Sequence, residues 1–237
     1  MFYWISRRSG FLALDNSCFA NELFTPSYAE YFYQLSSETR TRLNEEQLLA
    51  SDGISNRVLQ SIYRVLYRHE CLGGRRRCEL LPAHELAEIE RSGNSMLRVA
   101  IRGERGEVSD FRVDTIIACT GYKAVLPQYM EPLLLDLKWD GQHLVVRPDY
   151  SLAWTGPDDR RIFVQGLTRH QRGVADPNLG LMPWRNATII NSLAGRAVYD
   201  VQSESTAMGW ERAEAPGERG AHSQEVVYEA LPWREVG

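Results

Sequence analysis

The sequence lacks several features that would assign it to a class at once. It has no run of 18 apolar residues and no basic segment leading into a short apolar one, which argues against a membrane-spanning helix or a secretory leader. Only Lys123 and Lys138 are lysines among its 27 basic residues, and the net charge of -4 gives no positive excess for binding nucleic acid. We therefore expect a soluble, cytoplasmic, globular protein that acts on neither membranes nor nucleic acids.

Its cysteines also lack a recognisable pattern. They stand at positions 18, 71, 78 and 119, with no framework of regular spacing. Two histidines and two cysteines do fall close together: His69, Cys71, Cys78 and His84. Their order, H-x-C-x6-C-x5-H, does not match the short ligand pairs of structural zinc sites. We expect reduced cysteines and no bound metal.

The chain opens on an apolar segment, Met1 to Ile5, that ends in Arg7 and Arg8. Such a strand resembles the second strand of a dinucleotide-binding unit, where basic residues at the strand end accept a ribose phosphate. None of the 18 glycines, however, stands in the G-x-G-x-x-G spacing that precedes such a strand. By itself the pattern fits a surface strand end better.

Helical and strand periods then alternate along the chain. Thr25-Pro26 predicts a helix start, with an apolar stripe of Tyr28, Tyr31, Phe32 and Leu35. A second helix is predicted after Ser55, with this stripe: Val58, Leu59, Ile62, Tyr63, Leu66 and Tyr67. From residue 76 the period changes to two, which predicts a β-meander turning at Gly103 to Gly106.

Two further strands and a helix are predicted in the second half. The apolar run Thr115–Cys119 predicts a buried strand that stops at Thr120-Gly121, and Arg161–Gln165 predicts another. A loop follows, and then a helix from about Leu181 with this apolar face: Trp184, Ala187, Ile190, Leu193, Ala194 and Ala197. Residues 202–237 have no sustained period and are expected to form a flexible tail.

Four stretches together resemble one family. They are ISRRSGFLALDNSCFANELFTPSYAEYF, EEQLLASDGISNRVLQSIYRVLY, DTIIACTGY and HQRGVADPNLGLMPWRNATIINSLAGRAVY, and they span about residues 2–200. In order and spacing they are similar to the flavin-dependent N-hydroxylating monooxygenases of siderophore biosynthesis, which act on lysine, ornithine or related diamines. The resemblance implies hydride transfer from NADPH to FAD and delivery of one oxygen atom of O2 to a terminal amine.

The resemblance also implies a fold and its divisions. The fold is an α/β flavoprotein with two dinucleotide-binding domains, incomplete here: a partial Rossmann-like NADPH domain, a β-meander and the C-terminal part of an FAD domain. The expected divisions are residues 1–118 (with a substrate-binding helical insert at about 15–70 and the meander at about 76–118), 119–201 and the tail at 202–237. Complete members are expected to form homotetramers.

Cofactor-binding residues follow from the same resemblance. Arg7 matches an arginine that contacts NADPH, and Arg8 is a supporting candidate. Thr120 and Gly121 lie in the run that resembles the family's ATGY element. Asn178 and Leu179 match the loop between flavin and substrate, where a helix N-terminus can place backbone donors near the flavin's carbonyl edge. No residue is assigned a catalytic role.

Substrate-binding candidates are Asn21, Ser51, Asp52 and Gly180. Asn21 matches an asparagine that binds the amino-acid head of the substrate, although an asparagine capping its own loop is an alternative. Ser51 and Asp52 are head-group candidates in an SDGIS run that favours lysine or a diamine over ornithine. Gly180 replaces the family's usual serine, and Pro183 its usual alanine. His170, near this loop, is interpreted as a packing residue rather than a general base.

Two functions from different classes remain open. The first is the C-terminal portion of a lysine N6-hydroxylase, with ornithine or a diamine (putrescine or cadaverine) as alternative substrate. Because the glycine fingerprints and the family's upstream substrate lysine are missing, we expect this chain alone to be inactive and not to bind FAD tightly. The second is a non-catalytic remnant or complementation module, in which an unpaired opening strand seeks another chain.

Overall fold

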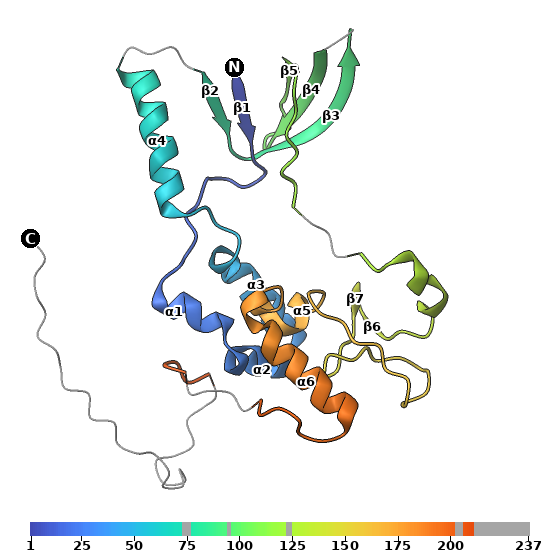
Figure 1. Cartoon of the computed structure of the whole chain (residues 1–237). Coiled ribbons are helices and arrows are strands. Elements are labelled where there is room, and N and C mark those ends of the chain that lie inside the picture. Colours follow the sequence, from blue (N-terminus) through green and yellow to red (C-terminus); the bar gives the residue numbers. More distant parts are fainter. Residues whose placement is uncertain (73–76, 94–95, 122–124, 202–205, 211–237) are drawn as a thin grey trace, which may run out of the picture.

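The computed structural model describes residues 1–72, 77–93, 96–121, 125–201 and 206–210. Its elements form two groups, visible in Figure 1. One group, the sheet unit, contains the strands of residues 1–10 and 77–113 together with helix α4 (Asn56–Cys71). The other, the helical unit, contains residues 15–50 and 125–201 with the short segment 206–210.

Two strands of the sheet unit run parallel. β1 (Phe2–Ile5) pairs with β2 (Cys78–Leu81), with Phe2 opposite Cys78 and Ile5 opposite Leu81. The predicted opening strand is therefore confirmed, and the expectation that it is unpaired was wrong. A parallel pair requires a long crossover, and here the crossover carries every helix from α1 to α4.

The β-meander is confirmed. β3 (His84–Ser92), β4 (Met96–Gly103) and β5 (Val108–Val113) form an antiparallel sheet in the order β3-β4-β5. The turn between β4 and β5 closes with a hydrogen bond from the Gly106 amide to the Gly103 carbonyl at 3.0 Å. Tyr3 of β1 stacks on Phe111 of β5 with ring centroids 4.2 Å apart, so the two sheets are in contact.

The crossover begins with the helices of the helical unit. In chain order they are α1 (Cys18–Asn21), η1 (Glu22–Phe24), α2 (Pro26–Gln34), α3 (Ser37–Glu46) and η2 (Leu48–Ala50). The predicted start of α2 is confirmed, because the Thr25 side chain accepts the Tyr28 amide and Pro26 occupies the first turn. Tyr28 and Phe32 are fully buried, as the stripe predicted.

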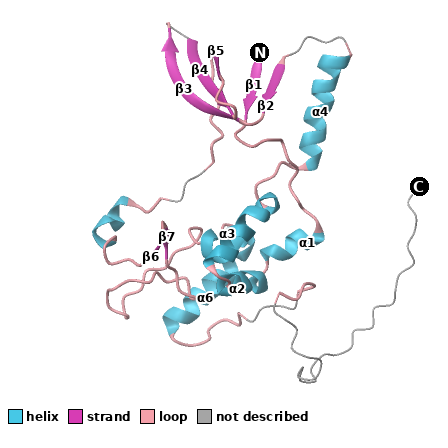
Figure 2. Cartoon of the chain, turned by 180° about the vertical axis from the view of Figure 1, so that it is seen from behind, coloured by secondary structure: helices cyan, strands magenta, loops and turns pink. Residues whose placement is uncertain are grey.

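The rest of the helical unit comes from the second half of the chain. Its elements are η3 (Gln128–Leu133), β6 (Trp139–Asp140), β7 (His143–Leu144), α5 (Arg169–Arg172), η4 (Gly173–Ala175), η5 (Leu179–Leu181) and α6 (Met182–Ala194). One apolar core lies under η3 and the β6–β7 hairpin and includes Leu144, Val146 and Leu152. A smaller one joins Ala29 of α2 to Ala175 and Leu181. Figure 2 shows from behind how α2, α3 and α6 lie together.

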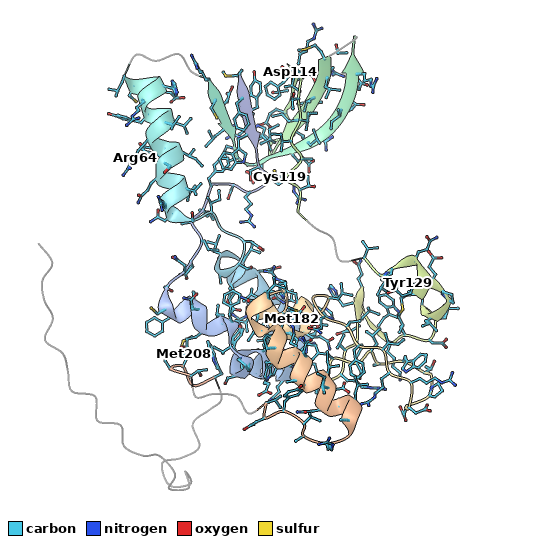
Figure 3. All side chains as sticks on the ribbon, in the orientation of Figure 1. Arg64, Asp114, Cys119, Tyr129, Met182 and Met208 are labelled. Carbon is cyan, nitrogen blue, oxygen red and sulfur yellow. The ribbon has the colours of Figure 1, made fainter. Side chains whose placement is uncertain are left out.

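The predicted buried strand at Thr115–Cys119 was wrong. The run is extended beyond β5 but pairs with no strand of the described residues, and its side chains are exposed, Ile117 at 77%. An apolar run forms a buried strand only where neighbouring strands accept its backbone groups. Figure 3 labels Cys119 in this connection between the two units.

Two other expectations hold only in part. Arg161–Gln165 forms no regular strand, and its pairing is the single bridge between Ser151 and Phe163. α6 starts with Pro183 in its first turn as predicted, but Ile190 and Leu193 of its expected buried face are exposed. The buried side chain of α6 is Arg185, 3% exposed.

Most of the expected flexible tail, residues 202–237, lies outside the described residues. Residues 206–210 are described and pack against α2, where the Trp210 ring lies 4.6 Å from Tyr28 and 6.0 Å from Tyr31. The tail prediction did not foresee this aromatic contact of Trp210.

Candidate functional site

A groove of about 830 Å³ lies in the helical unit. One wall is the turn from η1 into α2, with Glu22, Thr25 and Pro26. Another part of the lining is the turn from η5 into α6, with Gly180 and Trp184 among its residues. Glu22, which follows the candidate Asn21, and Gly180 of the predicted flavin loop thus line the same groove, although they are far apart in sequence.

The chain segment after α6, residues 199–201, also lines the groove. Trp184 Nε1 donates to the Val201 carbonyl at 3.4 Å, and Asn191 Oδ1 accepts the amides of Val198 and Tyr199 at 2.7 and 2.9 Å. Asn191 Nδ2 returns a hydrogen bond to the Tyr199 carbonyl at 2.8 Å. These bonds hold Tyr199, Asp200 and Val201 on the groove wall.

A buried network fixes the flavin-loop turn from behind. Asp176 is 2% exposed, and its carboxylate accepts both the amide and the hydroxyl of Thr168, the amide at 2.8 Å. Arg185 donates to the Asp176 carbonyl and, at 3.2 Å, to Gln165. Since each group is tied to a separate stretch of backbone, the residues just before Asn178 have little freedom to move.

Arg172 is a third buried charge of this region, beside Asp176 and Arg185. Its guanidinium lies 4.1 Å from the Tyr33 ring centroid and 4.6 Å from that of Tyr150, and Nη2 donates to the Pro148 carbonyl at 2.7 Å. Its neighbour Gly173 has a φ of +75°, and a Cβ there would lie 3.1 Å from the Phe32 ring. Sequence reasoning missed Arg172, Asp176 and Arg185, because their roles follow from packing partners distant in the chain.

Ser51 and Asp52 occupy the junction between the two units. Arg169 of α5 pairs with the Asp52 carboxylate at 3.2 Å and donates to the Ser51 hydroxyl at 3.3 Å, while Arg8 donates to the Asp52 carbonyl. Gly53 approaches Leu14 so closely that a Cβ would lie 2.3 Å from the Leu14 Cα. Neither Ser51 nor Asp52 lines the groove. Both contact Arg169, which joins the two units, and their role in binding the substrate head group stays a prediction.

The candidate cofactor-binding residues Arg7, Thr120 and Gly121 are exposed. Arg7 lies on the surface after β1, and Thr120 and Gly121 end the exposed run that leaves β5. Gly121 adopts a φ of +77°, which glycine accommodates without strain. An exposed guanidinium at a strand end suits a phosphate, so Arg7 fits its predicted role, which stays a prediction.

The remaining loop candidates are brought together only in part. Gly180 lines the groove, whereas Asn21 is exposed at the end of α1 and Leu179 is 74% exposed. Asn178 caps η5, with its side-chain oxygen accepting the Gly180 amide at 2.7 Å. Because the Gly180 amide already donates to Asn178, it is not one of the backbone donors that could bind a flavin carbonyl as predicted.

His170 has the packing environment predicted for it. Its ring stacks on His143 with centroids 4.4 Å apart, and Nε2 lies 2.9 Å from the Leu144 carbonyl oxygen. Burial lowers the pKa of His170, and the charge of His143 lowers it further, against the opposite effect of the hydrogen bond to Leu144. The preferred state is a neutral ring that donates from Nε2.

Two features are absent from the described residues. No group of three or more His, Cys, Asp and Glu side chains in them is arranged to hold a metal ion. None of the helices in the same part of the chain is both long enough and apolar enough to cross a membrane.

Solved structures of amine monooxygenases share this architecture. The FAD-bound cadaverine monooxygenase DfoA of Erwinia amylovora matches with a TM-score of 0.77 and 25% identity, over 90% of this chain and 49% of its own. Ornithine hydroxylase PvdA of Pseudomonas aeruginosa matches with a TM-score of 0.71 and 27% identity, over 81% of this chain and 46% of its own. The fold and the groove motifs thus define an α/β chain of the flavin N-monooxygenase class.

Sequence comparisons give the family. The model of the L-lysine 6-monooxygenase/L-ornithine 5-monooxygenase family matches residues 1–124, and the chain belongs to this family. L-lysine N6-monooxygenase of Escherichia coli is 38% identical over 210 residues, 87% of this chain and 49% of that protein. Putrescine N-hydroxylase of Shewanella oneidensis is 29% identical over 201 residues, 84% of this chain and 39% of that protein. The chain spans about half the length of the curated relatives it matches, or less.

Proposed function

We propose that this chain provides the C-terminal portion of an NADPH- and FAD-dependent N-hydroxylating monooxygenase that acts on a primary amine in siderophore biosynthesis. The observation that carries the proposal is the groove, which is lined both by Glu22 of the Phe19–Phe24 segment and by Gly180 and Leu181 of the Asn178–Leu181 turn. Both segments match family motifs, and the family itself is established from the sequence.

The nucleotide side is assigned to the sheet unit. In the proposal, residues 1–118 hold NADPH in a partial Rossmann-like domain, with Arg7 and Arg8 at its phosphate, and residues 119–201 belong to the FAD domain. The parallel pair β1–β2 with a helical crossover supports a dinucleotide-binding topology. When bound, NADPH and FAD supply the hydride and activate O2 for transfer to the amine.

The groove side has a different task. The accepting amine must be neutral to act as a nucleophile, and apolar walls such as Trp184 and Leu181 disfavour its charged form. The same walls exclude water from the reacting atoms. The Asp176 and Arg185 network keeps the Asn178 turn in place, so that Gly180 and Leu181 present a fixed wall to the substrate.

We favour L-lysine as substrate, with ornithine, putrescine and cadaverine as alternatives. Support comes from the SDGIS run and from the 38% identity to the lysine enzyme, against 29% identity to both the Shewanella putrescine enzyme and the Pseudomonas ornithine enzyme. One methylene changes binding by only about 1 to 3 kcal/mol, so side chains of the groove can set the choice. We also propose a cytoplasmic homo-oligomer.

Activity measurements test the proposal. The complete, flavin-loaded monooxygenase of which this chain is the C-terminal portion is incubated with NADPH, O2 and each of the four amines, and hydroxylamine product is quantified. We expect the complete protein to give the highest kcat/KM with lysine, and absence of hydroxylamine with all four amines would refute the proposal. A flavin spectrum of the purified chain addresses the second class of function: we expect less than stoichiometric FAD, and full occupancy would show that these residues suffice to bind it.

A further inference from the structure

Residues 206–210, the Trp210 segment, connect the groove with helix α2. Thr206 is one of the residues that line the groove. Its hydroxyl donates a hydrogen bond to the Met208 carbonyl at 2.6 Å, which closes a short turn within the segment. Figure 3 labels Met208 in this turn. The hydrogen bond shapes the segment but does not attach it to the rest of the helical unit.

The ring of Trp210 attaches the segment to α2. Its centroid lies 4.6 Å from that of Tyr28, in an edge-on arrangement, and 6.0 Å from that of Tyr31, in a stacked one. Tyr28 is 1% exposed, and its hydroxyl donates to Gln47 at 2.5 Å, so the ring that receives Trp210 is itself held in place. Aromatic pairs of this kind stabilise a contact beyond the apolar area that they bury.

Helix α2 therefore has two tasks at the groove. Its start, with Thr25 and Pro26, belongs to the lining, and tyrosines of the same helix hold the Trp210 ring. Thr206 stands only four positions before Trp210. A chain of this length spans at most about 14 Å. As long as the Trp210 ring stays on α2, Thr206 is therefore kept at the groove.

Only the ring of Trp210 contributes to this contact. Its Nε1 atom is buried and has no hydrogen-bond partner among the described residues. In water this N–H would donate a hydrogen bond, so its burial opposes docking, whereas the ring contacts favour it. A phenyl ring, which has no polar atom to bury, should therefore dock in the same place. The indole of Trp184 differs, because it lines the groove and donates to the Val201 carbonyl at 3.4 Å.

We propose that Trp210 is a positioning residue: by docking on Tyr28 and Tyr31, it holds Thr206 against the groove and so limits the entry of water. The inference goes beyond the proposed function, on which it rests only for the effect on the reaction. Its effect on the groove itself can be measured without flavin.

The entry of water decides how the reducing equivalents are used. In a shielded site, one amine, O2, NADPH and a proton give the hydroxylamine, NADP+ and water. Where water reaches the reacting atoms, O2, NADPH and a proton give hydrogen peroxide and NADP+ instead, and the amine stays unchanged. Exclusion of water prevents side reactions of this kind.

Exchange of the Trp184 indole proton with water, followed by NMR on the full chain without flavin, measures the access of water to the groove. We expect Trp210→Ala to speed this exchange by about fivefold or more, because the segment leaves the groove. Trp210→Phe should exchange like the unaltered chain. An unchanged rate in Trp210→Ala, or a rate in Trp210→Phe as high as in Trp210→Ala, would overturn the inference.

Tyr31→Leu tests the contact from its other side. It removes the stacked ring from α2 and should also speed the exchange, so it decides the question even if Trp210→Ala fails to fold. Combined with Trp210→Ala it should add little, because both substitutions remove the same contact. Fully additive effects would show that the two residues act independently and would contradict the inference.

Trp139→Ala is the matched control. Trp139 lies on β6, is 43% exposed and is not part of the groove lining. Its replacement should leave the exchange of the Trp184 indole unchanged. Equally fast exchange in this control would mean that the loss of any tryptophan loosens the molecule, and the specific role of Trp210 would be refuted.

The complete, flavin-loaded protein supplies the functional readout. With lysine as substrate, we expect Trp210→Ala to raise the share of oxidised NADPH that ends as hydrogen peroxide by about threefold, at a similar rate of NADPH oxidation. A general loss of folding would instead lower NADPH oxidation without changing that share. An unchanged share would overturn the inference and leave the monooxygenase assignment intact. If the unaltered protein hydroxylates no amine, the proposed function fails, while the exchange measurement still decides whether Trp210 shields the groove.

Discussion

The sheet unit and the helical unit are stabilised in different ways. In the sheet unit, α4 has no fully buried residue, and apolar side chains such as Tyr63 and Ile89 are exposed. In the helical unit, Arg172, Asp176 and Arg185 are each 3% exposed or less and bind backbone and rings from distant segments. The comparison indicates that the groove turn is held by a specific polar network, whereas the sheet unit combines strand pairing with buried apolar residues of β4: Val99, Ala100 and Ile101.

The strongest test of this comparison is Arg172→Ala. We expect it to lower the free energy of unfolding by about 3 to 5 kcal/mol, because it empties a buried site and leaves the Pro148 carbonyl without its donor. Leu59→Ala, on the partly exposed face of α4, should cost only about 1 kcal/mol. Urea unfolding measures both, and equal losses would show that the two units do not differ in this way.

Gly53→Ala tests the junction between the units. We expect a loss of about 1 to 3 kcal/mol, since the new Cβ would lie 2.3 Å from the Leu14 Cα. Gly10→Ala is the control, because its Cβ would meet only Leu12 at 3.8 Å. Thermal unfolding of the two variants should separate them clearly. If the Gly53→Ala protein is as stable as the control, the backbone at the junction can shift to accommodate the new Cβ at little cost in free energy.

Asp52→Asn also tests the junction between the units, with a smaller expected loss of stability. It removes the ion pair with Arg169, whose two side chains are 37% and 33% exposed, so the expected loss is below about 1 kcal/mol and shrinks at high salt. Asp158→Asn, at a side chain 99% exposed, should have no effect. A salt-independent loss in Asp52→Asn would contradict an electrostatic origin.

The smallest effect expected is a pH dependence from the helical unit. Because the pKa of His170 is lowered in the folded state, the unfolded chain binds a proton at His170 more readily than the folded chain does. The contribution of neutral His170 to stability is therefore full above the ordinary histidine pKa of about 6.5. It is lost as pH falls through the lower pKa of the folded state. His170→Gln should flatten the decline in unfolding free energy between about pH 7 and pH 5. An unchanged slope in this variant would place the titration elsewhere.

Local signals in the sequence predicted the local structure well. Thr25-Pro26 marked the start of α2, the alternating residues gave the β-meander, and Pro183 marked the first turn of α6. Each of these depends on neighbours a few positions away, which a sequence displays directly. Of the substrate-binding candidates given by the motif resemblance, Gly180 lines the groove, whereas Asn21, Ser51 and Asp52 do not.

Features that depend on distant partners were not predictable in the same way. Thr115–Cys119 has the composition of a buried strand but no strand beside it within the described residues. Nothing in the sequence distinguishes Arg172 from a surface arginine. Only the structure shows that its guanidinium contacts the rings of Tyr33 and Tyr150.

The pairing of β1 with β2 has a consequence for the order of folding. Phe2 is opposite Cys78, so the first strand has no partner until the whole helical crossover has been synthesised. The backbone hydrogen bonds of helices α1 to α4 join residues close in sequence and can form early, whereas closing so long a loop is slow. We therefore expect β1, although it precedes the crossover in the chain, to be among the last elements to reach its native place.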